Sequence, residues 1–140
     1  MSAVSPDIVA AYRAAVYEVD DAFGSIRIQI DTWASESDSL LRRAGVDTGF
    51  FITAYNPASI ALCDAENLAA HETLEVSLRQ IGVTYLTARG LDPTDRWPPE
   101  AGFFVLGLAR DDALGLARRF DQNGIVWVAT GRAPELVLLR

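Results

Sequence analysis

The spacing of apolar positions changes along the first third of the chain. Apolar residues at helical spacing follow the helix-start sequence Ser5-Pro6-Asp7 and predict a helix that continues to about Asp20. The residues with this spacing are Ile8, Tyr12, Ala15, Val16 and Val19. After Gly24 the period becomes two over residues 26–31, which predicts a half-buried strand. The polar residues 35–39 then predict an exposed loop that leads into a short helical turn over 40–44.

From residue 49 onward, strand-like and helix-like segments alternate. The predicted strands are 49–55, 83–88, 102–108, 124–130 and 135–139, and the predicted helices are 64–81 and 111–120. Residues 49–52 are similar to residues 102–105, and residues 82–86 are similar to residues 124–128. A strand, a helix and a strand therefore occur twice. This repeat predicts an α+β, ferredoxin-like βαββαβ antiparallel sheet over about 49–130, with an N-terminal helix and strand and a C-terminal extra strand.

The length of 140 residues and the apolar content suit a single domain, 1–140. Within it we distinguish an N-terminal helix–strand extension at 5–31, a loop at 32–48, and the repeated core at 49–140. The candidate functional residues all fall in this core.

Three polar segments meet at one edge of the predicted sheet. The first and third strands of a ferredoxin-like sheet are antiparallel neighbours, so residues 55–59, 97–100 and 122–124 lie at the same edge. The helix at 64–81 directs its free N–H groups to this edge as well. The candidate ligand-binding residues are Asn56, Ser59, Asn67, His71, Trp97, Glu100, Gln122 and Asn123.

Each candidate also has a purely structural interpretation. Asn56-Pro57 is typical of a turn, and Trp97-Pro98 is able to cover the end of the core. Gln122-Asn123-Gly124 is typical of a helix end. Asn67 and His71 share a helical stripe with apolar residues, so they face either a cavity beneath the Asn56 turn or solvent.

The composition excludes several kinds of chemistry. Every basic residue is an arginine, so a phosphate-loop lysine and a Schiff-base lysine are both excluded. One cysteine and one histidine form neither an internal disulfide nor a zinc cluster, and no catalytic residue, metal or cofactor is predicted. The net charge of −7 argues against binding to a nucleic-acid backbone. Without a signal peptide or an apolar run of ~20 residues, no membrane contact and a cytoplasmic location are expected.

The edge segments resemble a known family. The matching residues are Thr53-Ala54-Tyr55-Asn56-Pro57, Ser59, Glu66-Asn67, Trp97-Pro98, Glu100, Phe120 and Gln122-Asn123. Over about 49–130 they resemble the bacterial family known as domain of unknown function 3293. Asp121 departs from the glycine expected before Gln122. The resemblance implies that the three edge segments belong to one recurring set, but it implies no particular activity.

Three functions remain open at this point. The first is a binding or regulatory domain with a small polar site at the sheet edge, which takes an unknown small polar ligand. The second is an acidic protein-interaction module without a ligand pocket, with a protein partner or a second copy in a homodimer. The third is a small enzyme that uses Glu100 as acid or base, with amide donors from Asn56, Asn67 and Gln122.

Overall fold

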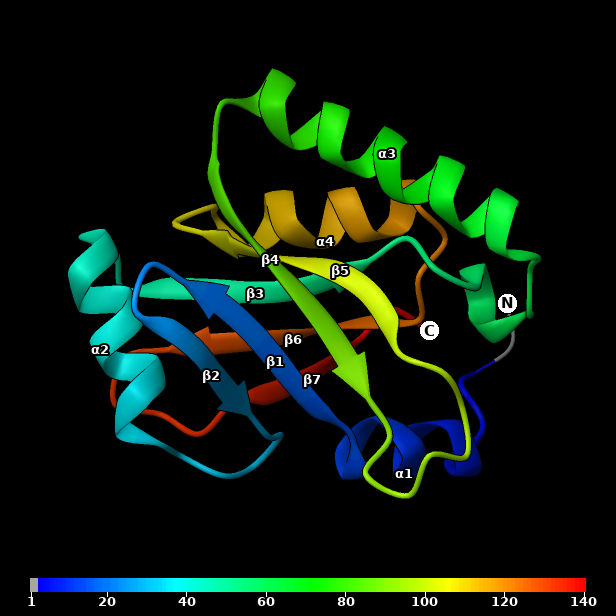
Figure 1. Ribbon diagram of the computed structural model, residues 1–140, viewed down its shortest axis with the longest axis horizontal. Helices are drawn as coiled ribbons and strands as arrows, with labels where there is room; N and C mark the ends of the chain where they lie inside the picture. The colour runs from blue at the N-terminus through cyan, green and yellow to red at the C-terminus, as the bar shows by residue number, and fades with distance from the viewer. Residues whose placement is uncertain (1–2) are drawn as a thin grey trace.

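The computed structural model describes residues 3–140 (Figure 1). In these residues, seven strands form one antiparallel sheet in the order β2-β1-β4-β5-β3-β6-β7. The strands are β1 (Val16–Asp21), β2 (Gly24–Ile28), β3 (Thr48–Thr53), β4 (Thr84–Leu91), β5 (Glu100–Leu106), β6 (Gly124–Ala129) and β7 (Glu135–Leu138). The helices are α1 (Pro6–Ala14), α2 (Ser35–Ala44), the 3-10 turn η1 (Pro57–Ser59), α3 (Asp64–Ile81) and α4 (Arg110–Arg119). The predicted mixed class with an antiparallel sheet is therefore confirmed.

The central strand β3 determines which loops meet. It pairs antiparallel with β5, where Phe51 lies opposite Phe104, and with β6, where Phe51 lies opposite Val126. Strand β4 pairs with the other side of β5. The predicted antiparallel pairing of the first and third core strands is confirmed. The end of β3 consequently lies beside the starts of β5 and β6.

Helices α3 and α4 cover one face of the sheet (Figure 1). Leu74 and Leu78 of α3 and Leu116 of α4 form one buried cluster with sheet residues such as Phe50 and Phe103. Because strand side chains alternate between faces, Phe51, Phe104 and Val126 belong to a second cluster on the opposite face. The two clusters make the sheet the middle layer of the molecule.

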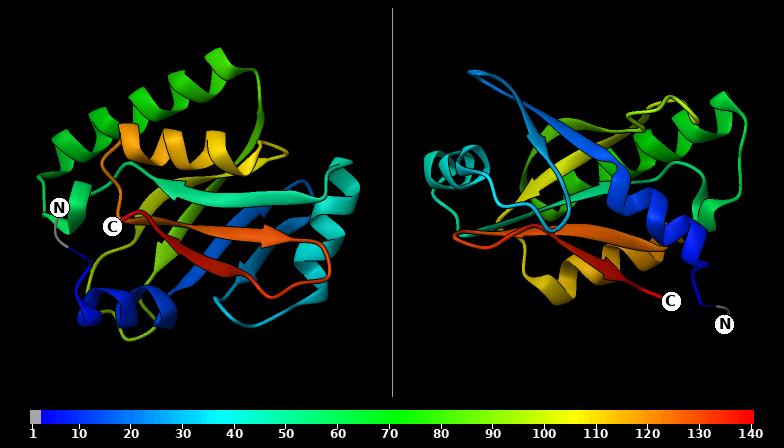
Figure 2. Two further views of the ribbon diagram at one scale, coloured as in Figure 1. Left: turned by 180° about the vertical axis from the view of Figure 1, so that it is seen from behind. Right: turned by 90° about the horizontal axis from the view of Figure 1, so that it is seen from below.

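The opposite face is enclosed by the curl of the sheet and by two helices. The Asp31 N–H donates a 2.8 Å hydrogen bond to the Pro134 carbonyl, which links the segment after β2 to the segment before β7. Helices α2 and α1 lie toward opposite ends of the sheet (Figure 2). Leu40 and Leu41 of α2 are buried in the cluster on this face, and Tyr12 of α1 packs against it.

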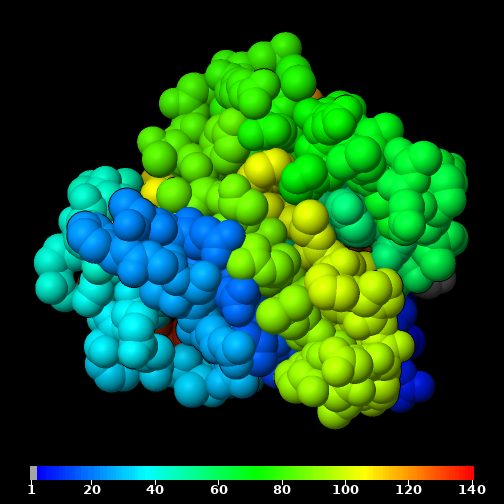
Figure 3. Space-filling model, viewed as in Figure 1, coloured from blue at the N-terminus to red at the C-terminus, as the bar shows by residue number. Residues whose placement is uncertain are grey.

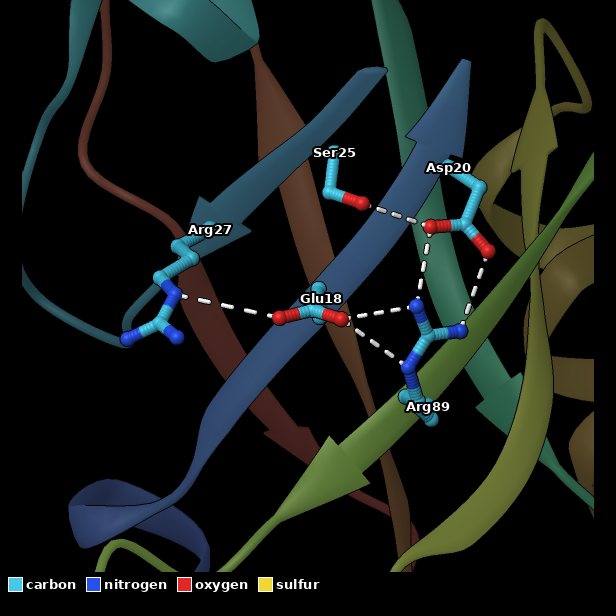
Figure 4. A network of polar contacts seen from close by, with 5 residues as sticks. All are labelled: Glu18, Asp20, Ser25, Arg27 and Arg89. Atoms are coloured by element: carbon cyan, nitrogen blue, oxygen red, sulfur yellow. Dashed lines mark hydrogen bonds and ion pairs between the residues drawn. The ribbon is translucent and has the colours of Figure 1, made fainter.

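The outer side of strand β1 carries a network of charges (Figure 4). Arg89 of β4 donates hydrogen bonds to Glu18 at 2.7 Å and to Asp20 at 2.9 Å. Ser25 of β2 also donates to Asp20. The hydrogen bond from Arg89, followed by that from Ser25, holds the pKa of Asp20 below its ordinary value. The network ties the β1–β2 hairpin to the core, and its charges are satisfied by one another.

Two predictions for the N-terminal third are wrong. The helix predicted to reach Asp20 ends at Ala14, and Val16–Asp21 is strand β1. Tyr17 and Val19 are buried while Glu18 points outward, so alternation across the sheet overrides the helical spacing. The predicted loop at 32–48 contains the ten-residue helix α2, which includes the helical turn predicted over 40–44 but begins at Ser35, within the segment predicted as exposed loop. Its serine-rich start has weak helix propensity, so burial of Leu40 and Leu41 accounts for it.

The core elements agree more closely with their predictions. Helix α3 has the predicted bounds, and Gly82 ends it with a left-handed φ of 80°. Strand β4 extends to Leu91, beyond the predicted end at 88, because Arg89 and Gly90 pair with β1. Among residues 3–140, no helix is both long and apolar enough to cross a bilayer.

Candidate functional site

A cavity of about 270 Å³ lies between α1 and the sheet face opposite α3 and α4. Its walls include Ile8 and Tyr12 of α1, and Tyr17 and Phe51 of the sheet. The segment that joins β4 to β5, which contains Trp97, lies in front of α1 and hides most of that helix from one side (Figure 3). The cavity is therefore a space at one end of the sheet that several distant segments enclose.

Five of the eight residues singled out in the sequence line this cavity. They are Asn56, Ser59, Trp97, Glu100 and Gln122. They come from the end of β3, the start of β5 and the approach to β6, which the antiparallel pairing of β3 brings together. The structure thus places the three polar segments at one edge, as their expected topology requires.

Asn67 and Asn123 lie behind the cavity wall. Asn67 is 4% exposed and hydrogen-bonds Asn56. Asn123 donates 2.7 Å and 3.1 Å hydrogen bonds to the hydroxyls of Ser59 and Tyr12, both of which line the cavity. These two residues position the lining and do not form it.

His71 lies apart from the cavity, so the alternative in which it faces the cavity, left open by the sequence together with exposure to solvent, is wrong. Its ring stacks on Phe103 at 4.5 Å between centroids, on the sheet face covered by α3. Its Nδ1 is buried with no hydrogen-bond partner among residues 3–140. Burial lowers the pKa of His71, while Glu75 and Glu72 oppose this effect. The helical stripe placed His71 correctly on α3, but the cavity is on the other side of the sheet.

Asn56 is the centre of the polar network at the end of β3. Its backbone N–H donates to Asn67 Oδ1 at 2.9 Å, and its Oδ1 accepts from the Leu62 N–H and Asn67 Nδ2, both at 3.0 Å. Its Nδ2 donates to Glu100 Oε2 at 2.6 Å. This network fixes the loop between β3 and α3 against the start of β5.

The same loop has an unusual backbone. Asn56, Ala58 and Ser59 have φ values of 45°, 54° and 61°, in the left-handed region that costs non-glycine residues roughly 1–2 kcal/mol each. The Ala58 N–H is held by the Asp121 carbonyl at 2.7 Å. Strain of this kind is concentrated at functional sites, where the surrounding contacts maintain it.

Asp121, the departure from the family pattern, also has a left-handed φ, of 54°. A glycine adopts this conformation without steric cost, and aspartate tolerates it better than most residues. The turn before Gln122 therefore keeps the geometry that a glycine favours. Gln122 Nε2 donates to the Tyr55 carbonyl at 3.2 Å and so joins this turn to the end of β3.

Residues that the sequence did not indicate also line the cavity, among them Tyr12 and Tyr17 of the N-terminal segment. Tyr12 Oη and Ser59 Oγ are 3.0 Å apart, and the Tyr17 hydroxyl donates to the Tyr12 carbonyl at 3.0 Å. Thr53 also lines the cavity, and its hydroxyl donates to the Ala101 carbonyl at 2.7 Å. Its position at the end of a strand, next to a polar turn, was a signal in the sequence that could have identified it as a site residue. Nothing in the sequence connects Tyr12 to a serine 47 positions away.

Glu100 is the only carboxylate among the described residues that line the cavity, and no arginine or histidine lines it. Burial raises the pKa of Glu100, and the hydrogen bond from Asn56 opposes this effect. Burial, then Tyr12 and then Glu100 raise the pKa of Tyr17. The cavity is thus acidic and lined by aromatic residues. Within residues 3–140, no three His, Cys, Asp or Glu side chains gather as a metal site requires.

The fold and the cavity describe an α+β protein with a partly open candidate site at the end of its sheet. The model of the protein family of unknown function DUF3293 matches residues 52–125, more than half of the 140 residues. The chain belongs to this family, as the edge segments indicated. Helix α1 and the β1–β2 hairpin lie outside the matched residues. No curated protein and no solved structure matches the chain.

Proposed function

We propose that this protein is a small-ligand-binding domain whose site is the cavity between α1 and the sheet. The observation that carries this proposal is a space of about 270 Å³ that five polar or aromatic side chains from three separate loops line together. Ligand pockets of this kind are concave and mostly apolar, with a few placed polar groups, and begin at about 300 Å³. The cavity lies just below this range and therefore suits a small molecule.

The hydrogen-bond network supports a binding role because it leaves the cavity open. Asn67 and Asn123 hydrogen-bond the lining residues Asn56 and Ser59 but do not themselves line the cavity. The space next to Glu100 and Trp97 therefore stays free of their side chains. The left-handed residues of the 56–59 loop belong to the same wall. Three left-handed residues within four positions, on both sides of Pro57, are more than an ordinary turn requires.

The proposal also describes β3, α3, β4, β5, α4 and β6 as a ferredoxin-like core. The strand order β4-β5-β3-β6 and the location of α3 and α4 on one face support this description. Folds of this kind host many unrelated activities, so the proposed function rests on the cavity and not on the fold.

A cavity-filling variant tests the proposal. Gly90 lines the cavity, and a Cβ added there meets the rings of Tyr17 and Phe51 at 3.6–3.8 Å, which is ordinary contact. An added Cβ is therefore tolerated at this position, and Gly90→Val is designed to reduce the free volume of the cavity with its methyl groups. Gly115→Ala is the matched control, because a Cβ added there on α4 meets nothing within 4 Å.

The experiment is a screen of small fragments by the shift in melting temperature of the full chain. We expect a subset of fragments to stabilise the wild type and Gly115→Ala equally, and to have no effect on Gly90→Val, which remains folded. Stabilisation by binding follows from the preference of the ligand for the folded state. Fragments that stabilise all three proteins equally, or no stabilising fragment at all, would overturn the proposal.

A further inference from the structure

We propose that the ligand of this cavity is a small organic cation: an ammonium group attached to a short apolar or aromatic body. This inference rests on the proposed function and specifies its ligand class. It follows from three properties of the cavity wall: its charge, its unused hydrogen-bonding groups and its aromatic surface.

The charge of the wall favours a cation. Glu100 contributes a carboxylate, and among the described residues no basic side chain lines the cavity. An anionic ligand would meet this carboxylate with no compensating positive group. A cation forms an ion pair with it in a site of reduced dielectric, where the attraction is stronger than in water.

Two acceptor oxygens of the wall are unused. Glu100 Oε2 accepts from Asn56, whereas Glu100 Oε1 has no hydrogen-bond partner within residues 3–140. Gln122 Nε2 donates to the carbonyls of Tyr55 and Phe120, which fixes the amide orientation and leaves Gln122 Oε1 without a partner in the described part of the chain. Neither oxygen is among the fully buried atoms that lack a partner, so both remain accessible.

Several donor groups of the wall are engaged with other protein groups. Thr53 Oγ1 donates to the Ala101 carbonyl, and the Tyr17 hydroxyl donates to the Tyr12 carbonyl. The hydroxyls of Tyr12 and Ser59 bond to each other and both accept from Asn123. The wall also holds free donors, since the indole N–H of Trp97 has no acceptor among residues 3–140 and only one of the Tyr12 and Ser59 hydroxyls donates to the other. The free oxygens Glu100 Oε1 and Gln122 Oε1 remain complementary to an ammonium group, which donates three hydrogen bonds.

The apolar part of the wall accommodates the rest of such a ligand. Tyr17, Phe51 and Trp97 present aromatic surface to the cavity. Aromatic faces attract cations, and they also bury apolar groups. The volume of about 270 Å³ limits the body of the ligand to a short chain or a single ring.

Three probes of matched shape test the inference. The probes are 2-phenylethylammonium, 2-phenylethanol and 3-phenylpropanoate, which are titrated at pH 7 into the wild type, Glu100→Gln and Glu36→Gln, with detection by calorimetry. Glu36 is an exposed carboxylate on α2, and its replacement removes the same charge away from the cavity. Glu100→Gln retains an oxygen that accepts from Asn56.

We expect the ammonium to bind the wild type and Glu36→Gln on the order of ten-fold more tightly than the alcohol, because a hydrogen bond to a charged group is stronger than a neutral one. We expect no binding of the carboxylate. In Glu100→Gln the ammonium should lose about ten-fold or more in affinity, while the alcohol is unaffected.

The possible failures are distinguishable. If the alcohol or the carboxylate binds the wild type as tightly as the ammonium, the cavity is a ligand site but the inference of a cation is wrong. If none of the three probes binds the wild type, both the inference and the proposed function are contradicted. The comparison of probes on the wild type decides between these outcomes even if Glu100→Gln does not fold.

Discussion

Asn56 Nδ2 donates a 2.6 Å hydrogen bond to Glu100 Oε2, and this contact joins two residues 44 positions apart in the chain. It fixes one oxygen of a half-buried carboxylate and leaves the other without a partner among residues 3–140, in a residue that lines a cavity with no basic residue in its described wall. The loop that contains Asn56 and the strand that begins with Glu100 therefore have two roles: they line the cavity, and their hydrogen bond holds the cavity wall in place. The predictions below separate these two roles.

Asn67 is expected to stabilise the folded protein by holding the Asn56 loop in place. Asn67→Ala leaves the Asn56 N–H without its acceptor and removes a donor to Asn56 Oδ1, both in a buried setting. Loss of such partners costs about 1–3 kcal/mol of unfolding free energy. Urea denaturation measures this loss. The exposed Gln80→Ala on the same helix is the control, with a change within about 0.5 kcal/mol; an equal effect of both variants would contradict the proposed support role.

Glu100 should give stability an unusual dependence on pH. Its pKa is raised in the folded protein, so the folded state binds this proton more tightly than the unfolded chain does. This contribution is fully present below the ordinary value of 4.5 and is lost as the pH rises through the folded-state pKa. Glu100→Gln does not ionise, so its unfolding free energy should increase relative to wild type as the pH rises from 4 to 7.

Glu135→Gln is the control of opposite sign. The hydrogen bond from Arg110 lowers the pKa of Glu135, so its contribution to stability is present at neutral pH and is lost as the pH falls. Denaturation of both variants and the wild type from pH 4 to 7 gives the unfolding free energy of each variant relative to wild type. This difference should rise with pH for Glu100→Gln and fall with pH for Glu135→Gln. A Glu100→Gln variant that is less stable than wild type at every pH would show that Glu100 is a structural acceptor.

The close approach of β3 and β5 beside the site leaves no room for a side chain at Gly102. A Cβ added there lies 2.4 Å from the Ile52 carbonyl oxygen and 2.8 Å from the Phe51 ring. Gly102→Ala should therefore lose about 1–3 kcal/mol of stability through overpacking. Gly115→Ala, in open space on helix α4, should gain up to about 1 kcal/mol from helix propensity. Thermal unfolding of the two variants checks the contrast, and equal shifts would refute it.

Leu78 tests the position of α3. It is 0% exposed, and Leu78→Ala should cost about 2–5 kcal/mol as a large-to-small core substitution. Val76 on the same helix is 47% exposed, so Val76→Ala should change stability by less than about 0.5 kcal/mol. Chemical denaturation gives both values. A loss below about half a kcal/mol for Leu78→Ala would place the helix on a different surface.

The sequence predicted the core elements well where two local signals agreed. The bounds of α3 follow from its apolar stripe and from Gly82, which is left-handed at the helix end. The approach of Asn56, Trp97, Glu100 and Gln122 follows from strand pairing alone, because antiparallel neighbours bring their opposite ends to the same edge. These relationships are local or topological, and periodicity is sufficient to find them.

The part of the cavity wall that comes from α1 and β1 was not predictable in the same way. Residues 12–19 satisfy a helical spacing and a strand alternation at once, and only the pairing of β1 with β2 and β4 decides between them. The contact of Tyr12 with Ser59 depends on this decision. His71 shows a related limit, since a helical stripe does not reveal which face of the sheet lies beneath it.

The indole N–H resonances of the three tryptophans test the central claim most directly. Trp97 lines the cavity, whereas Trp33 is on the surface and Trp127 packs beneath α4, so two of them are internal controls. On titration of the full chain with 2-phenylethylammonium, the Trp97 signal alone should shift and saturate in the wild type, and it should not move in Gly90→Val. Shifts of Trp33 or Trp127 without Trp97, or an unmoved Trp97 signal in the wild type, would contradict a ligand site in this cavity.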